Sequence, residues 1–178
     1  MKRLWRALRR RIRTLLALRR ARRTTLERLA GPPVRRVLVI CYGNIYRSPF
    51  AAEYLKRHAP NAEVRSAGFH SKVGRVSPPA HVAAAAARGI ELAGHRSRLV
   101  ERSDLDWADT IVLMDRRNFT HLDEARADPA KLVWLGVLAD GPVEIDDPYG
   151  RSESEASRLL DRLERGTAAL ATRINQAT

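Results

Sequence analysis

The chain has 178 residues, which is enough for one ordinary domain. Hydrophobic residues make up 44% and aromatic residues 6%, so a packed core is expected and a wholly disordered chain is excluded. A single cysteine, Cys41, excludes an internal disulfide framework and any metal site built from several cysteines. The formal net charge is +13, but twelve basic residues and one acid, Glu27, give residues 1–30 alone a charge of +11. The basic character therefore belongs to this segment and not to the rest of the chain.

Residues 1–30 are predicted to form a basic amphipathic helix. The segment from Lys2 to Leu29 lacks Gly and Pro and is rich in Leu, Ala and Arg, which favour helices. Apolar residues recur at helical spacing at Leu4, Trp5, Leu8, Ile12, Leu15 and Leu16. The longest apolar run is too short to span a bilayer.

Three interpretations of this segment stay open. The helix could bind an anionic membrane surface, with its apolar side chains inserted and its arginines on the head groups. It could instead dock on an acidic partner or on nucleic acid, although no specific nucleic acid is expected. Alternatively, it is a poorly ordered tail or a mis-assigned start. We expect a cytoplasmic protein, and the membrane interpretation would place it at the inner membrane face.

A linker at residues 31–34 is predicted to precede a domain at residues 35–178. Short apolar runs predict strands at 35–40, 63–66, 110–114 and 132–135. Helices are predicted at 48–58, 81–88, 118–127 and 152–176. Strands that alternate with helices predict an α/β fold, a three-layer sandwich with a four-stranded parallel sheet and helices on both faces. Ligands of such sheets bind beyond the carboxyl ends of the strands, which is where Cys41 follows the first strand.

The segment from Cys41 to Ser48 (CYGNIYRS) joins the first strand to a helix through a tight loop. Ser48 is expected at the helix N-cap and Pro49 at the first helical position. Backbone N–H groups of such a loop point inward and, with the positive end of the helix dipole, form an anion site. We expect Gly43 to supply a positive φ in this turn. The sequence thus predicts a phosphate-binding loop.

This loop also predicts chemistry at the cysteine. Arg47 can bind two phosphate oxygens at once through its planar guanidinium. The same field stabilises the thiolate of Cys41, which is then ready to attack phosphorus, and the Ser48 hydroxyl can donate to that thiolate. A carboxylic acid must protonate the leaving oxygen, and Asp147 in the segment DDPYG at 146–150 is the best candidate. An ordinary Asp-Pro turn is the plainer explanation of that segment.

The run VLVICYGNIYRSPFAAEYL resembles the active-site segment of the low-molecular-weight protein tyrosine phosphatase family. Further segments resemble that family in the same order, namely SAG at 66–68, HRSR at 95–98, LMD at 113–115 and DDPYG at 146–150. The resemblance extends from about residue 35 to the C-terminus, roughly four-fifths of the chain. It implies hydrolysis of phosphotyrosine in proteins through a phosphocysteine on Cys41. In that scheme Arg47 binds phosphate, Asp147 is the general acid, and no metal or other cofactor takes part.

The resemblance also implies a set of substrate-binding residues, namely Tyr42, Gly43, Asn44, Ile45, Tyr46, Ser48 and Tyr149. Among these, Asn44 would hold the strained loop, and Tyr42, Ile45 and Tyr149 would line the slot for the aromatic ring. The chain departs from the family pattern at two positions. Tyr46 stands where many members carry a second cysteine, and Arg88 stands where some carry a histidine that supports the asparagine. We therefore expect the support of Asn44 to differ from the family pattern.

Other functions compete with this one. An arsenate reductase that uses an external thiol needs only Cys41, and a phosphoarginine phosphatase shares the same loop. In the latter branch a Thr tends to stand at the position of Ile45. A phospho-binding module without catalysis is the non-enzyme alternative. The histidines show no metal-ligand spacing, and we expect them to be surface or packing residues; they are His58, His70, His81, His95 and His121.

Overall fold

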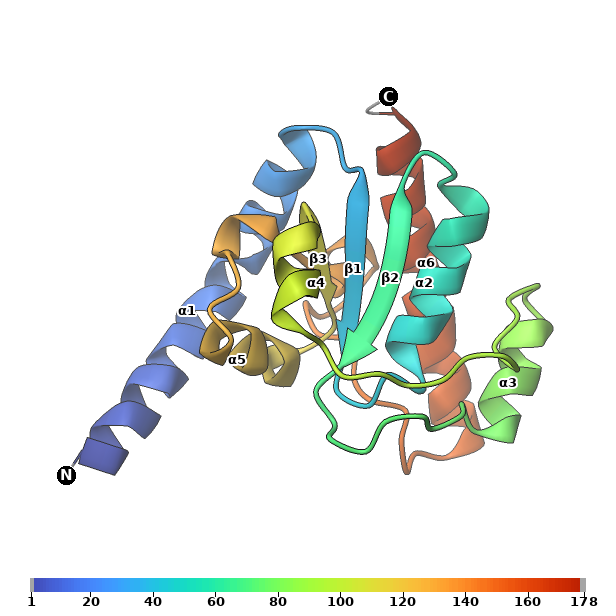
Figure 1. Cartoon of the computed structure of the whole chain (residues 1–178), viewed down its shortest axis with the longest axis horizontal. Coiled ribbons are helices and arrows are strands. Elements are labelled where there is room, and N and C mark those ends of the chain that lie inside the picture. Colours follow the sequence, from blue (N-terminus) through green and yellow to red (C-terminus); the bar gives the residue numbers. More distant parts are fainter. Residues whose placement is uncertain (1, 177–178) are drawn as a thin grey trace.

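The computed structural model describes residues 2–176, and its centre is a four-stranded parallel sheet (Figure 1). The strands are β1 (Arg36–Cys41), β2 (Glu63–Gly68), β3 (Thr110–Leu113) and β4 (Leu132–Trp134). They pair in the order β2-β1-β3-β4, every pair being parallel. This arrangement confirms the predicted α/β fold, with each strand shifted by at most two residues from its expected bounds.

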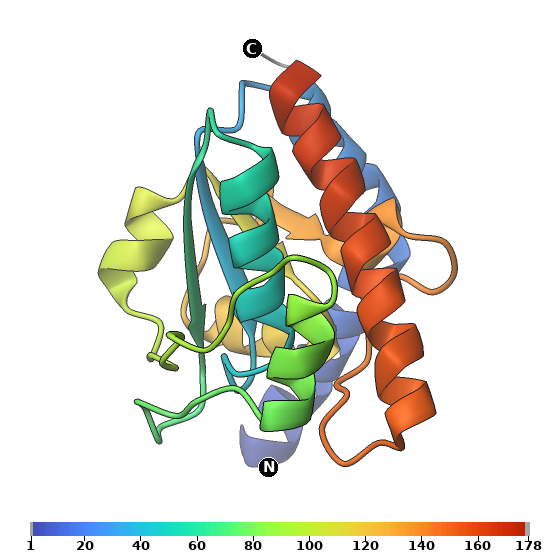
Figure 2. The same ribbon diagram turned by 90° about the vertical axis from the view of Figure 1, so that its right-hand side faces the viewer.

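Helices cover both faces of the sheet, as Figure 2 shows with the sheet seen nearly edge-on. One face packs against α2 (Arg47–His58), α3 (Pro79–Ala86) and α6 (Glu153–Gln176). The other packs against α1 (Lys2–Ala30), α4 (Arg102–Trp107) and α5 (Arg116–Glu124). Short 3-10 turns at Pro129–Lys131 and Leu135–Leu138 flank β4. Alternate residues of β1 enter the two cores, because successive side chains of a strand point to opposite faces.

The order of the strands places a binding crevice at the end of β1. The chain leaves β1 to form β2 on one side of it, and later returns to form β3 on its other side. Connections therefore diverge at the carboxyl end of β1, the kind of switch point at which open α/β sheets bind ligands. Cys41 is the last residue of β1 and pairs with Gly68 of β2.

The second half of α1 packs against the domain. Ala21 and Thr25 are fully buried, and the Thr25 hydroxyl oxygen accepts a hydrogen bond from the backbone N–H of Trp134 at 3.0 Å. Arg28 donates to the carboxylate of Asp109 at 3.3 Å. The helix thus covers β4 and contacts α5, while its first turns project beyond α5 towards the end of the molecule where β1 and β2 terminate (Figure 1).

Two local predictions were wrong. α2 begins at Arg47 with Tyr46 at its N-cap, so Ser48 lies inside the first turn and its hydroxyl is not a cap. α4 was not predicted, because it has six residues and too few apolar positions to show a period. Its signal was a capping box, in which the side chains of Glu101 and Asp104 each accept a backbone N–H of the other's position.

Candidate active site

The loop after β1 folds back under the end of the sheet. Its backbone is held by the two residues that follow β2, since the N–H groups of Phe69 and His70 donate to the carbonyl of Tyr42 at 2.9 and 3.0 Å. A Cβ added at Gly68 would lie 2.7 Å from that same carbonyl oxygen, so the close approach requires glycine there. The loop residue with positive φ is Asn44, at 50°, and not Gly43 as predicted. Such a conformation costs a non-glycine residue roughly 1–3 kcal/mol and needs support from its surroundings.

Four groups supply that support to Asn44. Its side-chain oxygen accepts from the backbone N–H of Arg98 at 3.0 Å, and its amide donates to the hydroxyls of Ser48 at 2.9 Å and Ser66 at 3.1 Å. Its carbonyl oxygen lies 2.7 Å from Nε2 of His95. Residue 88 takes no part in this network.

Arg88 makes its contacts away from Asn44. Its guanidinium pairs with Asp161 and Glu164 of α6. The pairing ties the end of the α3 segment to the closing helix. Arg88 is therefore a structural residue.

The thiol of Cys41 is buried at the centre of the loop. Its sulfur accepts a hydrogen bond from the backbone N–H of Asn44 at 3.2 Å and lies 3.1 Å from the Ser48 hydroxyl oxygen. The first N–H groups of α2 have no partner within the helix and add a positive end to this site. The N–H of Asn44 and the helix end thus direct positive partial charge toward the sulfur.

Arg47 lies beside the thiol and is almost fully buried. It donates to Asp115 at 2.6 Å, to the carbonyl of Ile145 at 2.8 Å and to Asp147 at 2.8 Å. Burial alone would lower its pKa, but the negative charges of Cys41, Asp115 and Asp147 outweigh burial and raise it. Its Nε–H is buried and has no hydrogen-bond partner within residues 2–176, which leaves one donor free for an anion.

The DDPYG segment brings Asp147, and not Asp146, to the site. One carboxylate oxygen of Asp147 accepts from Arg47, and the other accepts from the backbone N–H of Tyr149 at 3.2 Å. The side chain of Asp147 is 40% exposed, whereas that of Asp146 is 67% exposed and lies 4.0 Å from Arg151. The two neighbouring acids therefore face different surroundings.

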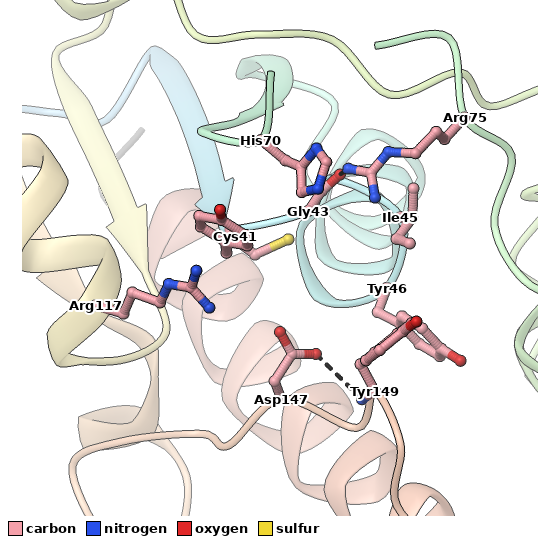
Figure 3. A pocket seen from close by; sticks show the side chains of 10 residues that line it. Cys41, Gly43, Ile45, Tyr46, His70, Arg75, Arg117, Asp147 and Tyr149 are labelled. Carbon is pink, nitrogen blue, oxygen red and sulfur yellow. Dashed lines mark hydrogen bonds between the residues drawn. The ribbon is translucent and has the colours of Figure 1, made fainter. Parts of the chain in front are cut away.

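A pocket of about 300 Å³ opens above Cys41 (Figure 3). Its lining includes six predicted site residues besides Cys41, namely Tyr42, Gly43, Ile45, Tyr46, Asp147 and Tyr149. Asn44, Arg47 and Ser48 are buried and do not line this pocket. Burial and the nearby Asp147 carboxylate raise the pKa of Tyr46, which keeps its phenol neutral.

The histidines were predicted to be surface or packing residues, but some of them contact the loop or line the pocket. His70 lines the pocket, and Nε2 of His81 lies 2.9 Å from the carbonyl of Tyr46. Burial lowers the pKa of His81 and of His95, so both rings are neutral at neutral pH. Each Nε2 must then carry the proton, because a carbonyl oxygen only accepts. Two neutral imidazoles thus fix the backbone of the loop from outside.

Three further residues of the site were not identified from the sequence. Asp115 caps α5 through Asn118 and orients Arg47. Arg75 donates to the carbonyl of Gly43 at 2.6 Å, and the guanidinium of Arg117 lies 3.3 Å from the ring centre of Tyr42. Asp115 directly follows the strand predicted at 110–114. It could have been found from the rule that ligands bind beyond the carboxyl ends of parallel strands. Within residues 2–176, no group of three His, Cys, Asp or Glu side chains could hold a metal ion.

Comparison with known proteins agrees with this geometry. Residues 36–178 match the family described as low molecular weight phosphotyrosine protein phosphatase. The chain is 34% identical over 139 residues to the low molecular weight protein-tyrosine-phosphatase Wzb of Escherichia coli (strain K12), covering 78% of this chain and 95% of Wzb. Among solved structures, the YwlE arginine phosphatase from Geobacillus stearothermophilus superposes with a TM-score of 0.71 and 28% identity, covering 80% and 94% of the two chains. The tyrosine phosphatase Wzb from Escherichia coli K30 in complex with sulphate superposes with a TM-score of 0.70 and 28% identity, covering 79% and 99%.

The sheet, its crevice and the cysteine loop define a cysteine-dependent phosphatase. The chain belongs to the low molecular weight protein tyrosine phosphatase family, as its sequence resemblance predicted. The matching region begins at β1 and leaves out α1.

Proposed function

We propose that this enzyme hydrolyses phosphotyrosine in proteins, with Cys41 as nucleophile, Arg47 as phosphate ligand and Asp147 as general acid. The observation that carries the proposal is that one pocket is lined by both the Cys41 thiol and the Asp147 carboxylate, and that Arg47 contacts that carboxylate from below. A phosphoryl group seated above the sulfur would meet the buried, unpartnered Nε–H of Arg47.

In the first step the Cys41 thiolate attacks phosphorus and an S–P bond forms. The bond between phosphorus and the phenolic oxygen breaks, and protonated Asp147 gives its proton to that oxygen. Tyrosine leaves as a neutral phenol and the phosphoryl group stays on Cys41. Backbone N–H groups and Arg47 neutralise the charge that is spread over the phosphoryl oxygens.

In the second step the Asp147 carboxylate removes a proton from a water molecule. The water oxygen attacks phosphorus, the S–P bond breaks, and the electron pair returns to sulfur as the thiolate. Inorganic phosphate leaves and Asp147 is again protonated. The Ser48 hydroxyl, 3.1 Å from the sulfur, donates to the departing thiolate.

The walls of the pocket favour an aromatic substrate. Tyr42 and Ile45 lie on the loop, and Tyr149 follows Asp147, with its ring 6.5 Å from that of Tyr46 in an edge-on arrangement. A flat phenyl ring fits between aromatic walls through stacked and edge-on contacts. The short side chain of phosphoserine would leave these walls unfilled and would not bring its phosphate to the sulfur.

A set of matched substrates tests this assignment. The same peptide should be offered with phosphotyrosine, phosphoserine or phosphoarginine, and arsenate should be tested with an added thiol. We expect kcat/KM for phosphotyrosine to exceed the others by at least about 100-fold, since only its ring fills the slot. A preference for phosphoarginine would support the activity that names YwlE instead, and reduction of arsenate would support the reductase alternative.

We also propose that the outer face of α1 binds an anionic membrane surface. Trp5, Leu8 and Ile12 are 63%, 49% and 47% exposed, and at 100° per residue they lie about half a turn from the packed residues Ala21 and Thr25. The side chain of Leu4 lies outside the described residues. Exposed arginines flank this apolar stripe, as anionic head groups require. No helix within residues 2–176 is long and apolar enough to cross a bilayer, so binding would be at the surface.

Point variants test membrane binding better than a deletion, because removing α1 would also remove the buried Thr25. The double variant Leu8→Glu, Ile12→Glu should lower binding to vesicles that contain anionic lipid by at least about tenfold in a sedimentation assay. The matched control is Val73→Glu, Val76→Glu, which places the same charges at equally exposed valines outside α1. Equal losses in the two variants, or no binding by the unaltered chain, would refute the proposal.

A further inference from the structure

A groove runs between α1 and α5, beside the active-site pocket. Arg11, Leu15 and Leu18 of α1 form one wall, and Arg116, Arg117 and His121 of α5 are on the other. The groove has a volume of about 570 Å³ and is open to solvent. Its α1 wall lies before residue 36, outside the region that matches the phosphatase family. One wall of the groove therefore comes from a helix outside the matched region, and the other comes from within it.

The groove and the active-site pocket share a boundary. Arg117 lines both of them, and its guanidinium points into the pocket from the α5 side (Figure 3). The ring of His121, another groove residue, stacks on the pocket residue Tyr42 with centres 5.8 Å apart. A peptide whose phosphorylated side chain enters the pocket would therefore pass over Arg117 into the groove.

Arginine side chains that have no carboxylate partner line this boundary. Within the described residues, Arg11 and Arg117 pair with no acid, whereas Arg116 is held by Glu144. The guanidinium of Arg117 stacks with its face on the Tyr42 ring, with Cζ 3.3 Å from the ring centre. The N–H groups at its edges therefore stay available to an acceptor. Glu124 is the acid that lines the groove, 3.8 Å from His121. The two unpaired arginines leave the groove ready for an anionic ligand.

We propose that this groove binds acidic residues that flank the phosphotyrosine of the substrate. The inference rests on the proposed phosphatase function and names the class of protein that the same site selects. An extended chain advances about 3.3–3.6 Å per residue, so an acid two or three positions from the phosphotyrosine can reach Arg117, and more distant acids can reach Arg11. Leu15 and Leu18 supply an apolar floor for the intervening side chains.

The test compares phosphotyrosine peptides with acidic flanks against peptides with Gln and Asn in place of every Glu and Asp. Acids are placed on the N-terminal side in one pair and on the C-terminal side in another. We expect the unaltered enzyme to prefer one acidic peptide over its neutral partner in kcat/KM by about threefold to tenfold at low salt. The preference should shrink at high salt, because exposed charges are screened.

Arg11→Glu should lower that preference, most strongly for peptides with distant acids, because Arg117 is retained. It should leave kcat/KM for p-nitrophenyl phosphate unchanged, because this small substrate has no flanking residues. Arg9→Glu is the matched control, since residue 9 is also exposed but lies about half a turn away around α1. A lower preference in Arg11→Glu alone supports the groove. Equal rates on acidic and neutral peptides, or equal effects of the two variants, would overturn it while leaving the phosphatase function intact. Failure to hydrolyse any phosphotyrosine peptide would instead refute the proposed function.

Discussion

Cys41→Ser should lower kcat/KM for phosphotyrosine and for p-nitrophenyl phosphate by at least about 10⁴-fold, as loss of the nucleophile does in other covalent mechanisms. A serine hydroxyl is not ionised at neutral pH, and no base lies beside it, because Ser48 and the N–H of Asn44 only stabilise an anion. The loop itself should persist, since Asn44 is held by Ser66, His95 and Arg98, none of which contacts the sulfur.

Binding of inorganic phosphate or vanadate separates the loss of a nucleophile from the loss of the site. Cys41→Ser should still bind phosphate, measured by calorimetry or by protection against thermal unfolding, because Arg47 and the loop amides are unchanged. Arg47→Ala is the contrasting variant and should lose phosphate binding as well as turnover. If Cys41→Ser retained turnover, a different residue would have to be the nucleophile.

Asp147→Ala should slow phosphotyrosine hydrolysis by about 10²- to 10⁴-fold in kcat/KM, the usual contribution of a general acid. The same variant should barely change kcat/KM for p-nitrophenyl phosphate, because nitrophenolate is a stable anion and leaves without a proton. Its kcat for that substrate should nevertheless fall, since Asp147 also serves as the base in the second step. This split between the two constants is specific to an acid that becomes a base.

Asp146→Ala is the matched control for that experiment. The neighbouring carboxyl is 67% exposed, lies 4.0 Å from Arg151 and lines no part of the pocket, so its loss should change either rate by less than about twofold. Equal slowing of both substrates in Asp147→Ala would argue that the residue acts by orienting Arg47, to which it is bound at 2.8 Å.

The central features of the fold could be predicted because their signals are local. The apolar run of β1, the turn after Cys41 and the helix that follows are contiguous, and the alternation of strands and helices defines the sheet. The position of Asp147 near Cys41 followed from the rule that carboxyl ends of parallel strands meet at one edge. A single short segment therefore indicated where the site would lie.

The rest depends on contacts between distant residues. No local pattern shows that His95 would meet the carbonyl of Asn44, 51 positions away. The contact between the Ser48 hydroxyl and the thiol was predicted, but the start of α2 one residue before Ser48 was not. The described side chains of the predicted apolar stripe of α1 are exposed, and the face that packs is the opposite one, which includes the small residues Ala21 and Thr25. Small buried residues at a helix–sheet contact give a weak signal in sequence. For this reason the sequence did not predict that α1 packs against the domain.

The proposed mechanism depends most on the transfer of the phosphoryl group to sulfur, and a rapid-quench experiment observes that transfer directly. Asp147→Ala is mixed with p-nitrophenyl phosphate, because its first step stays fast while its second step is slow. The reaction is then stopped with acid, and the peptides are analysed by mass spectrometry. We predict stoichiometric phosphate on the peptide that contains Cys41, and none when Cys41→Ser is added to the same variant. Phosphate on another residue, or a burst of nitrophenolate without any phosphorylated peptide, would contradict the mechanism.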